Sequence, residues 1–93
     1  IIFITEALSI NSEYSPAASN LSGVYFKMKE YKSALDYANK AVKMDKNNAS
    51  AYVNRGMAKE MTRDMVGACE DWLKAKELGS ETGKNYYAGN CGF

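Results

Sequence analysis

The chain has 93 residues, of which 46% are hydrophobic and 25% charged, and its formal net charge is +1. This length supports one thin core at most, and the composition is typical of a folded domain rather than a disordered segment. The low net charge argues against a nucleic-acid partner, and no stretch approaches the roughly 18 apolar residues that would insert in a membrane.

The first expected element is a helix at the N-terminus. Ala7 and Leu8 lie 34 residues before Ala41 and Val42. We therefore interpret residues 1–14 as the second helix of a repeat whose first helix is absent, and expect a piece of a longer array. The unpaired apolar face of such a helix tends to be covered by another chain, which makes homo-oligomerisation through the N-terminal helix an alternative function.

The next helix pair is expected in residues 15–48. Ser15 and Pro16 form a typical helix start, a hydroxyl N-cap followed by proline at the first helical position. Apolar residues then recur at spacings of three and four, which predicts one buried helical face. After a short polar turn, a second apolar stripe begins at Tyr31. Because the connection is so short, the two helices should pack antiparallel.

The same pattern recurs over residues 49–82. Asn48 is expected to cap the first helix of this pair, and Gly79 to end the second helix with a positive φ. Ser80 is expected to cap a last helix, so that residues 81–93 form a capping helix and tail.

A period of 34 residues relates the two helix pairs. Small residues recur at this spacing, Ala34 with Ala68 and Ala41 with Ala75. Such a period is typical of a solenoid, in which stacked units bury a core that no single unit could bury alone. Residues 1–93 are therefore predicted to form a single all-α domain of stacked antiparallel hairpins, which offers an extended surface for a partner.

The recurring residues resemble the tetratricopeptide repeat family, and the run from Gly67 to Ala75 resembles its bacterial members. The residues that match the family pattern are Leu21, Tyr25, Ala34 and Ala41 in the first full repeat, and Tyr52, Gly56, Ala68, Trp72 and Ala75 in the second. The resemblance implies a right-handed α-solenoid in which the first helix of each hairpin lines a concave groove. It also implies a protein–protein interaction scaffold that binds a peptide or protein partner.

Groove positions carried over from the family give the candidate partner-binding residues. They are Asn20, Phe26, Lys27, Val53, Asn54, Met57 and Met61. The two asparagines fall where the family often hydrogen-bonds a peptide backbone, although both could instead face solvent. The family's clamp for C-terminal carboxylates is missing, because its lysine and asparagine positions hold Ser19, Gly23 and Ser50.

Residue types that would indicate catalysis or a metal site are sparse. The chain has no histidine, so a histidine-activated nucleophile cannot be assembled. Two cysteines without histidine also fall short of a zinc site. Acidic pairs such as Glu70 and Asp71 lie at spacings that suit a solvated helix face. The sequence therefore predicts no enzyme, no cofactor and no metal.

Cys69 and Cys91 leave two alternatives open. If the last helix folds back at Ser80, both cysteines lie 11 residues from the turn, and a disulfide between them is geometrically plausible. That bond would indicate an oxidising compartment such as a periplasm or cell envelope. In the other alternative Cys69 is a buried thiol, Cys91 lies on a frayed tail, and the protein is cytoplasmic.

Overall fold

A computed structural model describes residues 15–91, and within that range the chain forms five helices. They are α2 (Ser15–Lys27), α3 (Tyr31–Met44), α4 (Ala49–Met61), α5 (Met65–Glu77) and α6 (Glu81–Asn90). Residues 1–14, with the expected N-terminal helix and its self-association surface, lie outside the described residues, as do residues 92–93.

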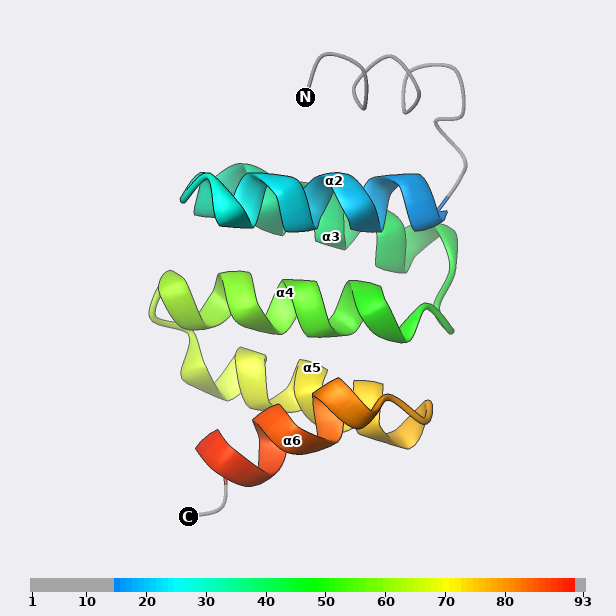
Figure 1. Cartoon of the computed structure of the whole chain (residues 1–93), viewed down its shortest axis with the longest axis vertical. Coiled ribbons are helices and arrows are strands. Elements are labelled where there is room, and N and C mark those ends of the chain that lie inside the picture. Colours follow the sequence, from blue (N-terminus) through cyan, green and yellow to red (C-terminus); the bar gives the residue numbers. More distant parts are fainter. Residues whose placement is uncertain (1–14, 92–93) are drawn as a thin grey trace.

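The helices are arranged in two layers. Helices α2, α4 and α6 lie side by side in one layer, with α3 and α5 behind them (Figure 1). Each helix runs back along the one before it, so that α2 pairs with α3 and α4 pairs with α5 (Figure 1). This stacking of antiparallel hairpins confirms the predicted all-α helical-repeat solenoid.

Polar side chains cap three of the helices. Asn48, Asp64 and Ser80 each accept a hydrogen bond from the backbone N–H three residues further on, at 3.2, 2.9 and 3.0 Å. Gly79, which follows α5, has a φ of +96°, a left-handed conformation that glycine adopts without strain. The caps at Asn48 and Ser80 and the glycine at the end of α5 are as expected from the sequence.

The hydroxyl of Ser15, the expected N-cap of α2, bonds to other helices instead. This buried hydroxyl donates to the Ala41 carbonyl oxygen at 2.8 Å and accepts from the Asn48 side-chain amide at 2.9 Å. Since Asn48 also caps α4, this short chain of hydrogen bonds joins the start of α2 to α3 and α4.

The recurring alanines form the centre of the core. Ala34, Ala41, Ala68 and Ala75 are all fully buried. Side chains this small let neighbouring helices approach closely, which is the packing role that the 34-residue period predicts for them.

The two hairpins fill the space between their helices differently. In the second hairpin a Cβ on Gly56 would lie 2.5 Å from Nε1 of the buried Trp72, so the indole occupies the space that glycine leaves. One period earlier the same two positions hold Ser22 and Ala38. Ser22 is fully buried and its hydroxyl donates to the Ala34 carbonyl oxygen at 2.7 Å. The second hairpin thus pairs a large tryptophan with glycine, whereas the first hairpin pairs two small residues, serine and alanine.

Asp71 does not lie on a solvated face, contrary to the expectation from its spacing. Its residue exposure is only 3%, because it points from α5 toward α4 and meets two cations there. Arg55 donates to both carboxylate oxygens, at 2.9 and 2.7 Å, and Lys59 Nζ lies 3.1 Å from the first of them. The hydrogen bond to Asp71 raises the pKa of the Arg55 guanidinium, although burial opposes the shift.

Candidate functional site

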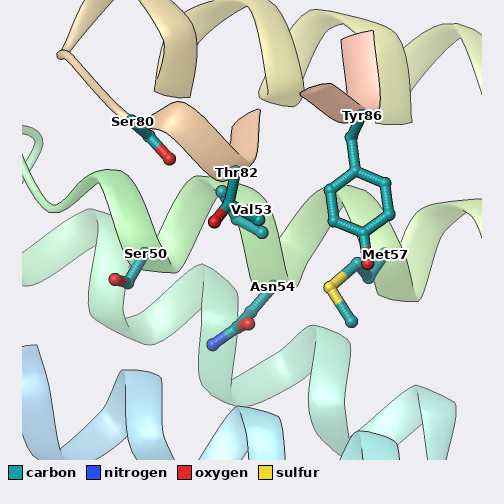
Figure 2. Close-up of a pocket in the computed structure, with 7 residues that line it drawn as sticks. All are labelled: Ser50, Val53, Asn54, Met57, Ser80, Thr82 and Tyr86. Atoms are coloured by element: carbon teal, nitrogen blue, oxygen red, sulfur yellow. The ribbon is translucent and has the colours of Figure 1, made fainter. Parts of the chain in front are cut away.

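Two adjoining hollows lie along the layer of α2, α4 and α6. The hollow between α2 and α4 is lined by Ser19, Asn20, Gly23, Val24, Lys27, Ser50 and Asn54. The hollow between α4 and α6 is lined by Ser50, Val53, Asn54, Met57, Ser80, Thr82 and Tyr86 (Figure 2). Because Ser50 and Asn54 line both, the two hollows form one continuous surface, which we call the groove.

The hollow between α2 and α4 is polar and shallow-walled. Gly23 and Ser19 keep its α2 side free of bulk, while Asn20 and Lys27 are exposed along the same helix. Lys27 is the one charged residue among those that line the groove. The groove is therefore close to neutral, and its lining offers hydrogen bonds more than ion pairs.

The hollow between α4 and α6 has an apolar floor and a polar rim. Val53 and Met57 come from α4, and the Tyr86 ring reaches across from α6 toward Met57 (Figure 2). Tyr86 is held from behind by Trp72, with ring centroids 5.1 Å apart and planes 18° from parallel. The volume of this hollow, about 290 Å³, is enough for a large apolar side chain.

Asn54 lies at the centre of the groove, where the two hollows meet. Its side-chain nitrogen donates to the Ser19 carbonyl oxygen at 2.9 Å and lies 3.4 Å from the Ser19 hydroxyl. The amide therefore ties α4 to α2 across the groove. Within the described range its carbonyl oxygen accepts no hydrogen bond, which leaves an acceptor for a partner's backbone N–H.

The structure brings five of the seven predicted residues to the groove. They are Asn20, Lys27, Val53, Asn54 and Met57. The other two line neither hollow. Phe26 packs against Tyr31 across the α2–α3 turn, with ring centroids 5.3 Å apart, and Met61 is 46% exposed at the last position of α4. Both lie near the ends of their helices, where the chain is already turning into the next helix.

Sequence reasoning missed the wall of the groove that α6 provides. The last helix was expected to act as a cap, so Ser80, Thr82 and Tyr86 were not among the candidates. The 34-residue period could have found this wall, because it aligns Tyr86 with Tyr52 and so makes α6 the counterpart of α4.

A disulfide joins Cys69 on α5 to Cys91, the residue that ends α6, with their Cα atoms 5.8 Å apart. The second wall of the groove is thus covalently attached to the helix behind it. Over residues 15–91 we find no cluster of His, Cys, Asp and Glu that could hold a metal ion, and no helix of that range has the length and hydropathy of a membrane span.

The chain matches no family model, but it has sequence relatives over part of its length. It is 37% identical over 60 residues, 64% of its length, to RNA polymerase II-associated protein 3 of Xenopus tropicalis. It is 35% identical over 52 residues, 56% of its length, to Tetratricopeptide repeat protein 6 of Homo sapiens. The chain spans only 9% and 10% of the length of these relatives. Both are vertebrate proteins, so they lend no support to the expectation of a bacterial type.

A solved structure has a similar fold over nearly the whole chain. It is the first TPR of Spaghetti (RPAP3) bound to the HSP90 peptide SRMEEVD, with a TM-score of 0.87 and 21% sequence identity. The match covers 96% of this chain and 72% of that chain.

Proposed function

We propose that this chain is a tetratricopeptide-repeat domain and a protein–protein interaction scaffold whose groove binds an extended peptide segment of a partner. The observation that carries this proposal is the continuity of the groove across three helices, with Ser50 and Asn54 shared by its two hollows. The RPAP3 domain with the same fold is itself bound to a peptide, which supports the proposal. We assign the two full repeats to residues 15–48 and 49–82, with residues 81–93 as the terminal segment.

The lining of the groove indicates what kind of segment it binds. Lys27 is its one charged residue, and Ser19, Gly23 and Ser50 occupy the positions of the family's carboxylate clamp. We therefore propose that the groove recognises an internal stretch of chain rather than a C-terminal carboxylate. The Asn54 carbonyl would accept from the backbone of the peptide, and the floor of the second hollow would take one apolar side chain.

The test begins with peptides selected on this protein from a random 12-residue display library. The Kd of a labelled selected peptide is measured by fluorescence anisotropy with a free and with an amidated C-terminus. We expect less than about a threefold difference, because losing a charge-assisted hydrogen bond to a terminal carboxylate would cost roughly 1.5 kcal/mol or more, which exceeds tenfold. A tenfold loss on amidation would show that the terminus is the recognised group.

A variant at the junction of the hollows tests the location. Ser50 is exposed, so Ser50→Arg places a long side chain in the groove without disturbing the core. We expect Kd to rise at least about tenfold. The matched control is Asp36→Arg, on the exposed face of α3 in the other layer, which should bind as the unchanged protein does. Equal affinity of Ser50→Arg and the unchanged protein would contradict binding in the groove.

A further inference from the structure

We propose that the Cys69–Cys91 disulfide is a redox modification site that controls the groove, because its reduction by a dithiol releases α6 and weakens peptide binding. This inference rests on the proposed function for its consequence, although the release of α6 can be measured without any peptide. It follows from three features of the molecule: what α6 contributes to the groove, how little stability its own sequence gives it, and where the disulfide lies.

Helix α6 provides one entire wall of the second hollow. Ser80 immediately precedes the helix, while Thr82 and Tyr86 lie within it, and all three line the hollow opposite Val53 and Met57 (Figure 2). If α6 moves away, the hollow loses the Tyr86 ring from its floor and both hydroxyls from its rim. The part of the groove that accepts an apolar side chain therefore depends on the position of α6.

The sequence of α6 gives it little stability of its own. Its ten residues are ETGKNYYAGN, which include two glycines and two asparagines and no leucine, isoleucine, valine, methionine or phenylalanine. Glycine and asparagine are poor helix formers, and a ten-residue helix is marginal in water without tertiary packing. Gly83 is the one buried residue of the helix, where it packs on Ala75. Tyr86 and Tyr87 are half-buried.

The disulfide holds the C-terminal end of α6. At its start the helix continues from α5 through a short turn, and the Ser80 cap fixes that end. At its other end Cys91 is 8% exposed and packs against Ala68 and Trp72 while bonded to Cys69. The bond closes a loop that contains all of α6, so cutting it returns the conformational freedom of that loop.

The chemistry of release is thiol–disulfide exchange with a dithiol reductant. A reductant thiolate attacks one sulfur of the disulfide, the S–S bond breaks, and the other cysteine leaves as a thiolate that takes up a proton. The second thiol of the reductant then attacks the mixed disulfide and frees the remaining cysteine. Two electrons and two protons pass to Cys69 and Cys91, and the reductant becomes a cyclic disulfide. Cys69 is partly exposed, which gives the reductant access.

The size of the effect follows from the fraction of molecules in which α6 is in place. When only a fraction of molecules is competent to bind, the apparent Kd is the intrinsic Kd divided by that fraction. If reduction leaves α6 docked in about one molecule in ten, the Kd of a peptide that uses the second hollow rises about tenfold.

The first measurement concerns α6 alone. Trp72 is the only tryptophan and stacks on Tyr86, so its emission reports whether α6 is docked. We expect reduction with dithiothreitol to shift this emission to the red and to accelerate amide hydrogen exchange in residues 81–90, while residues 15–61 keep their protection. Unchanged exchange in residues 81–90, or loss of protection throughout the chain, would overturn the proposal. Alkylation of two thiols in the unreduced, denatured protein would also overturn it, because the disulfide would then be absent.

The second measurement concerns binding. The probe is a cysteine-free, fluorescein-labelled 12-residue peptide selected on the oxidised protein, and we expect its Kd to rise about tenfold on reduction. The double variant Cys69→Ala/Cys91→Ala should bind as weakly as the reduced protein and should not respond to reductant. An unchanged Kd despite a released α6 would overturn control of the groove. Failure of any peptide to bind the oxidised protein would instead overturn the proposed function, whatever α6 does.

Discussion

At the residue scale, the two hairpins use different chemistry at equivalent positions. Three charged side chains meet between α4 and α5, whereas the side chains one period earlier, on α2 and α3, are apolar or aromatic. The charged set is Arg55, Lys59 and Asp71, and its counterparts are Leu21, Tyr25 and Tyr37. The rings of the two tyrosines stack with their centroids 5.5 Å apart. The fold therefore accepts either an ion network or aromatic packing between the helices of a hairpin.

This equivalence predicts strong coupling between Arg55 and Asp71. Arg55→Leu or Asp71→Tyr alone removes one partner of a buried pair, and each should lower the free energy of unfolding by about 1–3 kcal/mol. This lies below the range for a fully buried pair, because the Arg55 and Lys59 side chains remain 20% and 22% exposed. The double variant places at these positions the leucine and tyrosine that the first hairpin has at Leu21 and Tyr37. Its free energy of unfolding should therefore fall by less than the sum of the two single losses. Urea denaturation of the unchanged protein, the two single variants and the double variant gives the coupling energy. Losses that simply add in the double variant would contradict coupling between Arg55 and Asp71.

Gly56 offers a second prediction at this scale. The Cβ of Gly56→Ala would lie 2.5 Å from the Trp72 indole, and the resulting overpacking should cost about 1–3 kcal/mol in the free energy of unfolding. Gly89→Ala is the matched control, because nothing lies within 4 Å of its added Cβ. Alanine's higher helix propensity should make that variant neutral or slightly more stable. Thermal and urea unfolding test both, and a Gly56→Ala protein as stable as the unchanged one would mean that Trp72 is placed differently.

At the element scale, Asn48 does more than the other helix caps. It caps α4 and also donates to Ser15, whose hydroxyl bonds to the end of α3. Asp64 caps only α5. We expect Asp64→Ala to cost about 1 kcal/mol of stability and Asn48→Ala about 2, because the second substitution also removes a hydrogen bond between helices. Urea denaturation followed by circular dichroism measures both, and equal losses would indicate that the bond to Ser15 contributes nothing.

The helices themselves were readable from the sequence, because their boundaries depend on local chemistry. Caps such as Asn48 and Ser80 and the apolar spacings act within a few residues of chain. The burial of Asp71 was not readable, since a charge is tolerated inside only when cations from another helix reach it. The positions of Phe26 and Met61 depend on where each helix turns relative to the groove, which residue types alone do not fix.

At the scale of the whole molecule, the groove is a property of the stack and not of any hairpin. Its lining comes from α2, α4 and α6, which belong to successive units, and Asn54 ties the first two of these together. A binding surface built this way keeps its framework of buried alanines while its lining varies. The sequence period therefore predicts that a groove exists, whereas the wall from α6 and the disulfide behind it depend on how the last unit packs.

A groove shared by three helices predicts that one bound peptide contacts both hollows. Asn20 lines the hollow between α2 and α4 and Thr82 the hollow between α4 and α6, and both residues are exposed. Asn20→Arg and Thr82→Arg should each raise the Kd of the selected 12-residue peptide at least about threefold, with Asp36→Arg again as control. Because the two sites are on different helices with α4 between them, the effects in the double variant should multiply. Fluorescence anisotropy gives all the Kd values. If one variant is neutral, the peptide occupies a single hollow, and the groove acts as two separate sites instead of one track.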